Sequence, residues 1–301
     1  MRRAAARRKP RATRGIAQRG FGARASRQEK SAMQLGCSTL LYGALPLDAA
    51  LQGIARSGCG AIELCAIQGM APHLPDDLSP SRCRELATRI ADHGLAIESV
   101  GASTNLLDGQ AAVRFVRLMD IAAALGAPCI TTGPGGRPDD EESFAKVVAT
   151  LGELAKTARR VGTRVSIKPH VANAVYSTRT ALRLMNEVDR EWIGLNVDAS
   201  HLWRTPEKET PEHTIPSLLP FLFTARIRDT KGREIPIGPV EHQIPGNGAM
   251  NLPAIIHAFR QKPDLKWLTL EIVGCHTSKD AAYADGVVRT CVERLAPLVR
   301  D

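Results

Sequence analysis

The chain has 301 residues, 44% of them hydrophobic, and a formal net charge of +9 at pH 7. This length and composition allow it to bury the core of one large domain. No apolar run approaches the length needed to cross a bilayer, which excludes a membrane-spanning protein, and we expect no membrane partner.

The positive charge is concentrated in the first 32 residues. They contain nine arginines, two lysines and one glutamate, a net charge of +10, so the rest of the chain carries about −1. A segment this rich in arginine and poor in aliphatic residues is expected to be disordered. It has no apolar stretch of the kind that an export signal needs. A transit peptide, a nucleic-acid-binding arm and a misassigned start codon all fit; we favour Met33 as the true start, because it directly precedes the first predicted strand.

The seven cysteines form no CxxC pair, and most of them lie in apolar segments. Cysteine in such places acts as a small buried hydrophobic residue. We therefore expect a reducing compartment, the cytoplasm, and neither a disulfide framework nor a zinc knuckle.

Eight short apolar segments have the composition of buried strands. In chain order they are 34–38, 61–65, 95–101, 128–132, 164–167, 192–197, 225–228 and 267–272. Helical spacing of apolar residues follows most of them, at 46–56, 80–93, 111–125, 143–161, 180–188, 252–260 and 280–299. This alternation predicts an α/β protein, a single-domain (β/α)8 TIM barrel over residues 33–301. A doubly wound open sheet is the alternative, but no GxGxxG motif follows the first strand.

Polar residues gather where the predicted strands end. They are Glu63, Glu98, Thr132, Lys168, His170, Asp198, His201, Arg226, Arg228, Asp229 and Glu271. In a (β/α)8 barrel the carboxyl ends of the strands meet at one face, which carries the chemistry. A packed core does not require so many polar groups at one rim, so we expect them to form one shared site.

Five motifs occur in a specific order and spacing. They are IELCA at 62–66, VDASH at 197–201, RIRDTKG at 226–232, IPGNGAMNLPAII at 244–256 and LEIVG at 270–274. Together they resemble the xylose isomerase-like TIM barrel family of sugar phosphate isomerases and epimerases, from Met33 to the C-terminus. The resemblance implies a divalent metal held by Glu, Asp, His and Glu on strands five to eight, and a substrate histidine three residues after the Asp.

Carried over residue by residue, the resemblance places Asp198 and Glu271 at two of the four ligand positions and His201 at the substrate histidine. The other two positions hold Lys168 and Arg226, and a protonated lysine or a guanidinium cannot ligate a metal. We therefore expect no cofactor, with two side-chain cations standing where relatives hold the ion. Should a divalent metal bind (Mn, Mg, Zn or Co), its ligands would be Asp198 and Glu271.

The resemblance implies an enzyme that acts on a small carbohydrate by moving a proton at the carbon next to a carbonyl. We expect Glu271 to be the general base, Lys168 the partner acid, and Arg226 the group that stabilises the enolate oxygen. The residues expected to bind substrate are His201, His170, Asp198, Glu63, Trp203 and Arg228. The alternative for the two cations is a salt-bridge network without catalysis.

Four classes of function compete. An isomerase or epimerase of a sugar, keto-sugar or polyol derivative is preferred; a lyase or dehydratase on a similar substrate, and a non-catalytic sugar-binding barrel, are the alternatives. The resemblance also implies a DNA-repair endonuclease as a fourth class, since a branch of the superfamily cuts at abasic sites with a multi-zinc cluster, but Lys168 and Arg226 disrupt such a cluster. The near-neutral charge beyond the tail also argues against a nucleic-acid partner. The sequence leaves the substrate and the oligomeric state open, a homo-oligomer included.

Overall fold

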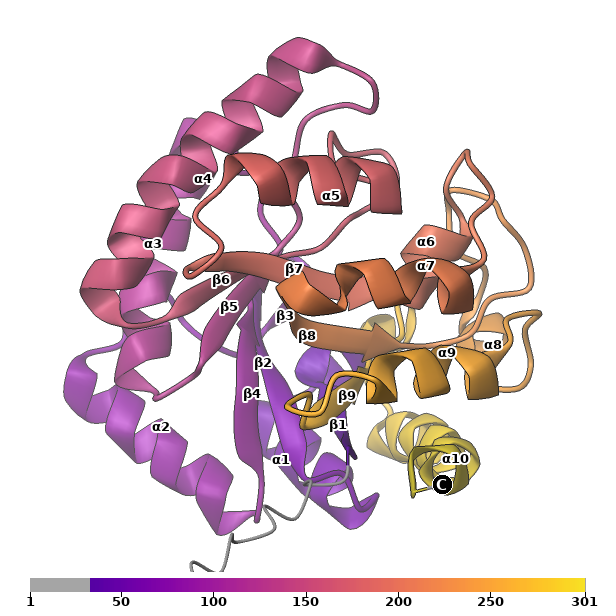
Figure 1. Ribbon diagram of the computed structural model, residues 1–301. Helices are drawn as coiled ribbons and strands as arrows, with labels where there is room; N and C mark the ends of the chain where they lie inside the picture. Colours follow the sequence, from indigo (N-terminus) through magenta and orange to yellow (C-terminus); the bar gives the residue numbers. More distant parts are fainter. Residues whose placement is uncertain (1–32, 301) are drawn as a thin grey trace, which may run out of the picture. The chain divides into compact units, whose positions relative to one another are not determined.

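Eight parallel strands close into a barrel in the computed structural model, which describes residues 33–300 (Figure 1). The strands are β1 (Gln34–Ser38), β2 (Ala61–Ile67), β4 (Ala96–Gly101), β5 (Cys129–Thr132), β6 (Arg164–Ile167), β7 (Ile193–Asp198), β8 (Leu222–Ile227) and β9 (Trp267–Leu270). Each pairs with its neighbours in chain order, and β1 pairs with both β2 and β9, which closes the ring. The predicted TIM barrel is confirmed. The predicted disordered tail at 1–32 lies outside the described residues.

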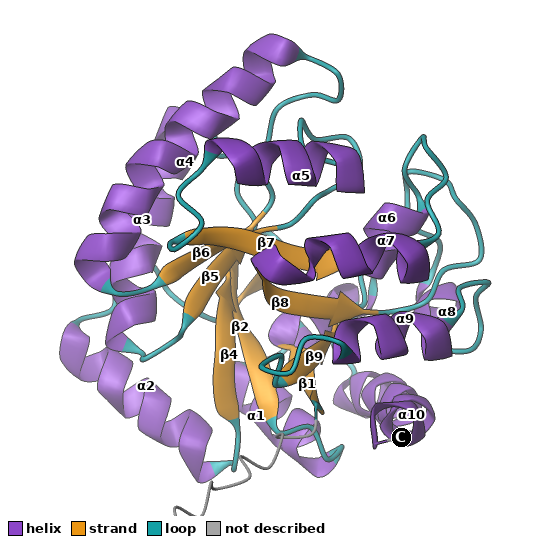
Figure 2. Ribbon diagram, viewed as in Figure 1, coloured by secondary structure: helices purple, strands orange, loops and turns teal. Residues whose placement is uncertain are grey.

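Helices surround the strands on the outside of the barrel (Figure 2). They are α1 (Leu47–Arg56), α2 (Pro80–Asp92), α3 (Gly109–Ala124), α4 (Glu141–Val161), α5 (Thr178–Glu187), α6 (Ala199–Trp203), α7 (Pro211–Leu218), α8 (Val240–Gln243), α9 (Leu252–Arg260) and α10 (Ala281–Arg300). A two-residue strand, β3 (Ala71–Pro72), pairs antiparallel with β2. Three 3-10 turns complete the secondary structure, at Thr39–Tyr42, Leu219–Phe221 and Cys275–Thr277. None of the helices within residues 33–300 has the length and apolar character that crossing a bilayer requires.

Capping residues fix where the helices begin and end. The Asp140 side chain accepts hydrogen bonds from the first free backbone N–H groups of α4, and Gly162, in the left-handed conformation with φ of +80°, ends that helix. Ser177 and Thr180 form a reciprocal capping box at the start of α5. The loops that follow β5 and β6 therefore end at Asp140 and Ser177, where α4 and α5 begin.

Two helices between β7 and β8 were not predicted. Helix α7 contains Pro211 and Pro216, which argue against a helix in a sequence pattern. Pro211 occupies the first turn, where its missing N–H has no intrahelical partner in any case. Helix α6 is five residues long, too short for a periodic pattern, and begins where the Asp198 side chain accepts from the backbone N–H of Ser200 at 2.9 Å.

The barrel interior is polar, whereas the layer between sheet and helices is apolar. Along β8, Ala225 and Ile227 belong to the apolar core, and Thr224 and Arg226 alternate with them and bond to residues of other strands inside the barrel. Successive residues of a strand point to opposite faces, so this alternation sends every second side chain inward. The buried polar residues inside the ring lead directly to the site above them.

Candidate functional site

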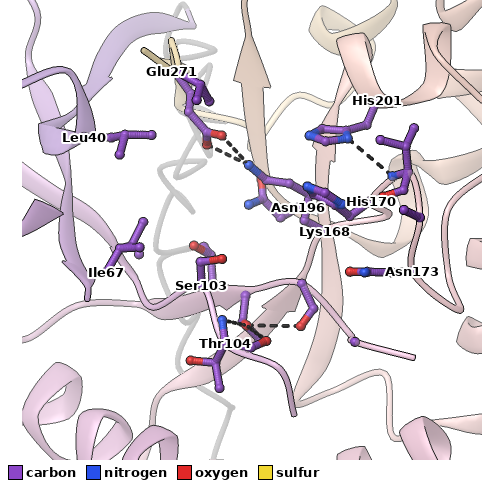
Figure 3. A pocket seen from close by; sticks show the side chains of 18 of the residues that line it. Leu40, Ile67, Ser103, Thr104, Lys168, His170, Asn173, Asn196, His201 and Glu271 are labelled. Carbon is purple, nitrogen blue, oxygen red and sulfur yellow. Dashed lines mark hydrogen bonds and ion pairs between the residues drawn. The ribbon is translucent and has the colours of Figure 1, made fainter. Parts of the chain in front are cut away.

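A cavity of about 640 Å³ opens at the carboxyl ends of the barrel strands, and all eight strands or the loops that follow them contribute to its wall (Figure 3). Leu40 and Ile67 lie on one side, and Lys168, His170 and His201 lie on the opposite side (Figure 3). This is the face of a TIM barrel on which active sites are built. The cavity is therefore the candidate active site.

Lys168 and Glu271 form an ion pair on the cavity wall. The Nζ atom of Lys168 lies 2.6 Å from Oε1 and 2.7 Å from Oε2 of Glu271 (Figure 3). Lys168 directly follows β6 and Glu271 directly follows β9, so the ends of two strands bring the two groups together. Their side chains are 13% and 9% exposed, which keeps both within reach of a molecule in the cavity. The structure thus places the predicted acid and base in direct contact.

Arg226 lies beneath the cavity and does not line it. Its Nη2 donates to Glu63 at 2.6 Å and to Ser99 at 3.0 Å, and its Nη1 donates to Glu98 at 3.1 Å. Its Nε is 3.5 Å from Oε2 of Glu271. The guanidinium is fully buried, so it has no surface with which to meet an enolate oxygen. The expected contact between Arg226 and substrate does not fit this position.

Arg226 lowers the pKa values of the two carboxylates in this buried cluster, and burial raises them. Burial alone would raise the pKa of Glu63, but Arg226 and Lys168, with hydrogen bonds to the carboxylate, lower it to about 2. Burial dominates at Glu98 and raises its pKa despite the nearby guanidinium. Glu63 also lines the cavity, as expected for a substrate-binding residue, whereas Glu98 does not.

Arg228, not Arg226, pairs with Asp198. Nη2 of Arg228 donates to Oδ2 of Asp198 at 2.7 Å, and its Nε donates to the Ser200 hydroxyl at 2.8 Å. Burial would raise the pKa of Asp198, but Arg228 and Lys168 lower it to about 2. Asp198 is buried and does not line the cavity, so the expected contact between Asp198 and substrate does not fit this position.

His170 and His201 stack against each other on the cavity wall, with ring centroids 4.2 Å apart. Burial and the nearby Lys168 lower the pKa of His170 to about 4. Burial, His170 and Arg228 lower the pKa of His201 well below its ordinary value. Both rings are neutral near pH 7. Nδ1 of His170 lies 2.6 Å from the carbonyl oxygen of Val171 and donates to it, which leaves Nε2 as an acceptor.

Trp203 does not line the cavity. Its Nε1 donates to the carbonyl oxygen of Gly232 at 3.2 Å, and the guanidinium of Arg233 stacks on its ring at 3.6 Å. The residue therefore packs against the loop that follows β8, and the expected contact with substrate does not fit its position.

Asn196 and Arg204 are two of the cavity-wall residues that the sequence analysis did not predict. Asn196 lies in β7, and neither atom of its amide has a hydrogen-bond partner within residues 33–300. Its position two residues before Asp198, on the same face of the strand, was a usable signal. Arg204 lies three residues after His201 on the same helical face, and it also lines the cavity.

A family model described as a xylose isomerase-like TIM barrel matches residues 51–288. The chain belongs to this family. The resemblance inferred from the five motifs is thereby confirmed. A comparison with curated protein sequences gave no match.

Several solved structures share the barrel. A structure of IolI protein with a bound zinc atom is 19% identical, with a TM-score of 0.71, and the match covers 89% of this chain and 98% of that one. The probable 3-DHS dehydratase AsbF from Bacillus anthracis is 17% identical, with a TM-score of 0.71 and coverage of 88% and 99%. D-psicose 3-epimerase in the presence of D-fructose is 17% identical, with a TM-score of 0.70 and coverage of 89% and 100%. Identities this low show a shared fold.

The four positions that the family pattern assigns to a metal do not suit a divalent cation in this chain. Two of them hold the cations Lys168 and Arg226, and the two acids are engaged by protein cations, Asp198 by Arg228 and Glu271 by Lys168. Hard divalent ions take several oxygen ligands. Within the described part of the chain, no three or more His, Cys, Asp or Glu side chains gather in a way that would hold an ion.

Proposed function

We propose that this protein is an isomerase or epimerase of a sugar, keto-sugar or polyol derivative that moves a proton at the carbon next to a carbonyl, and that it works without a divalent metal. One observation carries the proposal: Lys168 and Glu271, an ammonium and a carboxylate, touch at 2.6 and 2.7 Å on the wall of the cavity. Acid–base pairs of this kind contribute about 10²–10⁴-fold to a proton transfer.

Glu271 takes the proton from the carbon next to the carbonyl, which leaves an enolate, and the ammonium of Lys168 gives a proton back to carbon. Glu271 then passes its proton to Lys168 across their hydrogen bond, which restores the pair. Because the two groups are in contact, both reach a bound substrate from the same side of the cavity. Epimerisation returns the proton to the opposite face of the carbon, whereas an aldose–ketose isomerisation can use one face. The geometry therefore favours isomerisation.

Arg228 replaces Arg226 as the group that stabilises the enolate oxygen. It lines the cavity, and its Nη1 atom has no hydrogen-bond partner within residues 33–300 and lies 3.9 Å from Oε1 of Glu271. A preorganised guanidinium beside the base is placed to stabilise negative charge as it develops on an adjacent oxygen. Arg226 supports the site from below by pairing with both Glu63 and Glu98.

Substrate hydroxyl groups have several partners on the wall. Nε2 of His170 accepts, the Asn196 amide both donates and accepts, and the Glu63 carboxylate accepts. Neutral histidines and an unpartnered amide suit a polyhydroxylated ligand, which offers a donor and an acceptor at each oxygen.

Hydrogen exchange between substrate and heavy water tests the proposal. The purified protein, assayed for metal content, is incubated with a panel of aldoses and ketoses, and deuterium incorporation is followed by NMR. We expect exchange with wild type, reduced about 10²–10⁴-fold in Glu271→Gln and in Lys168→Met. The exposed residues Glu241 and Lys156 provide the matched controls Glu241→Gln and Lys156→Met, which should exchange normally.

Three other results would each contradict part of the proposal. An elimination product would make the protein a lyase or dehydratase, since loss of a β-hydroxyl can follow the same proton abstraction. Binding of sugars without any exchange would indicate a non-catalytic sugar-binding barrel. Stoichiometric Mn, Mg, Zn or Co in active protein would reject the metal-free mechanism.

A further inference from the structure

Arg204 is a buried cation without an acidic partner among residues 33–300. It is 4% exposed and lines the cavity. Its Nε donates to the carbonyl oxygen of Ser200 at 3.0 Å, its Nη1 to the carbonyl oxygen of Ile235, and its Nη2 lies 3.3 Å from Nδ1 of His201. A guanidinium has five N–H groups. Two of them, one on each terminal nitrogen, are left for a ligand.

The neighbouring His201 faces more donors than it can accept from. Nη2 of Arg228 lies 3.0 Å from its Nε2, and the backbone N–H of Val171 and Nη2 of Arg204 lie 3.4 and 3.3 Å from its Nδ1. A neutral imidazole has one donor nitrogen and one acceptor nitrogen. In either tautomer, the protonated nitrogen of His201 faces another N–H donor. This corner of the cavity therefore lacks a hydrogen-bond acceptor.

Charge in the same corner is also unbalanced. The cations Lys168, Arg204 and Arg228 face only two carboxylates, Asp198 and Glu271, and the histidines are neutral. These five groups sum to +1, whereas Glu63 and Glu98, which share Arg226 on the other side of the cavity floor, sum to −1 with it, so the positive excess is local to this corner. Burying an unpaired charge is costly, and a bound anion removes that cost.

We propose that Arg204, in the cationic corner that it forms with Arg228 and His201, binds a carboxylate of the substrate. The inference rests on the proposed function and narrows its substrate to a sugar acid or a keto-sugar acid. A carboxylate carries one negative charge and matches the excess, whereas a phosphate monoester carries about −1.5 to −2. The planar guanidinium also suits two parallel hydrogen bonds to a carboxylate.

The opposite side of the cavity floor sets the orientation of the substrate. Glu63 and Glu98 share the single cation Arg226 there, so that side offers no positive charge to an anion. A carboxylate is repelled from Glu63 and attracted to Arg204. The hydroxylated end of the substrate then lies toward Glu63, and its carbonyl lies near Arg228 and Glu271.

Calorimetric titration of the full chain tests the inference with matched probes. D-glucuronate is compared with D-glucose, D-fructuronate with D-fructose, and the 6-phosphates of both sugars complete the set. We expect each uronate to bind about tenfold more tightly than its neutral counterpart, as one charge-assisted contact provides. Arg204→Gln should abolish this preference, and Arg204→Lys, which keeps the charge, should retain part of it. Arg260→Gln, on the exposed side of α9, is the control and should bind like wild type.

The results separate this inference from the proposed function. Three results overturn the carboxylate site. They are equal affinity for uronates and neutral sugars, an unchanged preference in a folded Arg204→Gln variant, and tighter binding of the 6-phosphates than of the uronates. If Arg204→Gln does not fold, Arg204→Lys and the wild type decide the question. A folded Arg204→Lys variant that keeps part of the preference for uronates supports the site, and a wild type without that preference overturns it. Uronate binding without hydrogen exchange would reject the proposed function and keep the carboxylate site, whereas exchange on neutral sugars without acid preference would do the reverse.

Discussion

Arg226 of β8 donates to Glu63 of β2 at 2.6 Å across the barrel interior, and both side chains are buried. Arg226→Met removes the only cation in direct contact with the buried Glu63 and Glu98 within the described residues. Breaking a buried pair from one side costs about 3–5 kcal/mol, and we expect a loss of this size in the free energy of unfolding. Chemical denaturation measures it.

Two comparisons make this prediction specific. Arg56→Met breaks an exposed pair with Asp285 and should cost less than about 1 kcal/mol. Adding Glu63→Gln to Arg226→Met should recover part of the lost stability, because the uncompensated carboxylate is removed. A cost for Arg226→Met no greater than that for Arg56→Met would show that the buried acids do not depend on the guanidinium.

Chelation is expected to leave the stability of the protein unchanged. Both acids at the family's metal positions are already paired, Asp198 with Arg228 and Glu271 with Lys168. Anything that binds the folded state raises the melting temperature, so removal of a bound ion would lower it. Thermal denaturation with and without EDTA, together with elemental analysis, checks the point. A fall in melting temperature with EDTA, restored by one added cation, contradicts it.

Stability should decrease as the pH falls from about 6.5 toward 4. The pKa of His170 is about 4 in the folded protein against an ordinary value of 6.5, so between these values the unfolded chain binds a proton that the folded chain does not. His201, whose pKa is also lowered, acts in the same direction. Each proton contributes a slope of about 1.4 kcal/mol per pH unit. Denaturation at a series of pH values should show a slope smaller by about one proton in His170→Gln; an unchanged slope would mean that His170 titrates normally.

Trp203→Phe should lower stability slightly and leave substrate affinity unchanged. The phenyl ring keeps a surface for Arg233, while the hydrogen bond from Nε1 to Gly232 is lost, at a cost of about 1 kcal/mol. Denaturation and KM are measured on the same variant, once a substrate has been found. A large rise in KM without a loss of stability would restore Trp203 as a substrate contact.

The fold could be predicted because the barrel strands are short apolar runs at a regular spacing, each followed by a turn. The helices between β7 and β8 escaped detection, because α7 contains two prolines and α6 is a single short turn capped by Asp198. The Asp198 cap is local, but helices this short depend on packing against the rest of the protein for most of their stability.

The sequence predicted which way the side chains of the site point, but not how deep in the barrel each of them lies. Arg226 and Arg228 are two residues apart, so both point into the barrel, and the sequence could not say which one reaches the cavity. Depth depends on the register between strands. The backbone of Arg226 lies beside that of Asp198, the last residue of β7, so Arg226 is still within the sheet, whereas Arg228 follows the end of β8. Lys168 and Glu271 were predicted to lie together because both are at the carboxyl ends of predicted strands, which meet at one face of the barrel.

The buried cluster around Arg226 has a consequence for how the chain folds. Glu63 and Glu98 belong to the first third of the barrel, while their cation arrives 163 and 128 residues later in the chain. An intermediate made of the first strands therefore lacks the contact that holds these two acids in the native barrel. The contact forms only when β8, the seventh of the eight barrel strands, is in place, and such long-range contacts favour slow refolding.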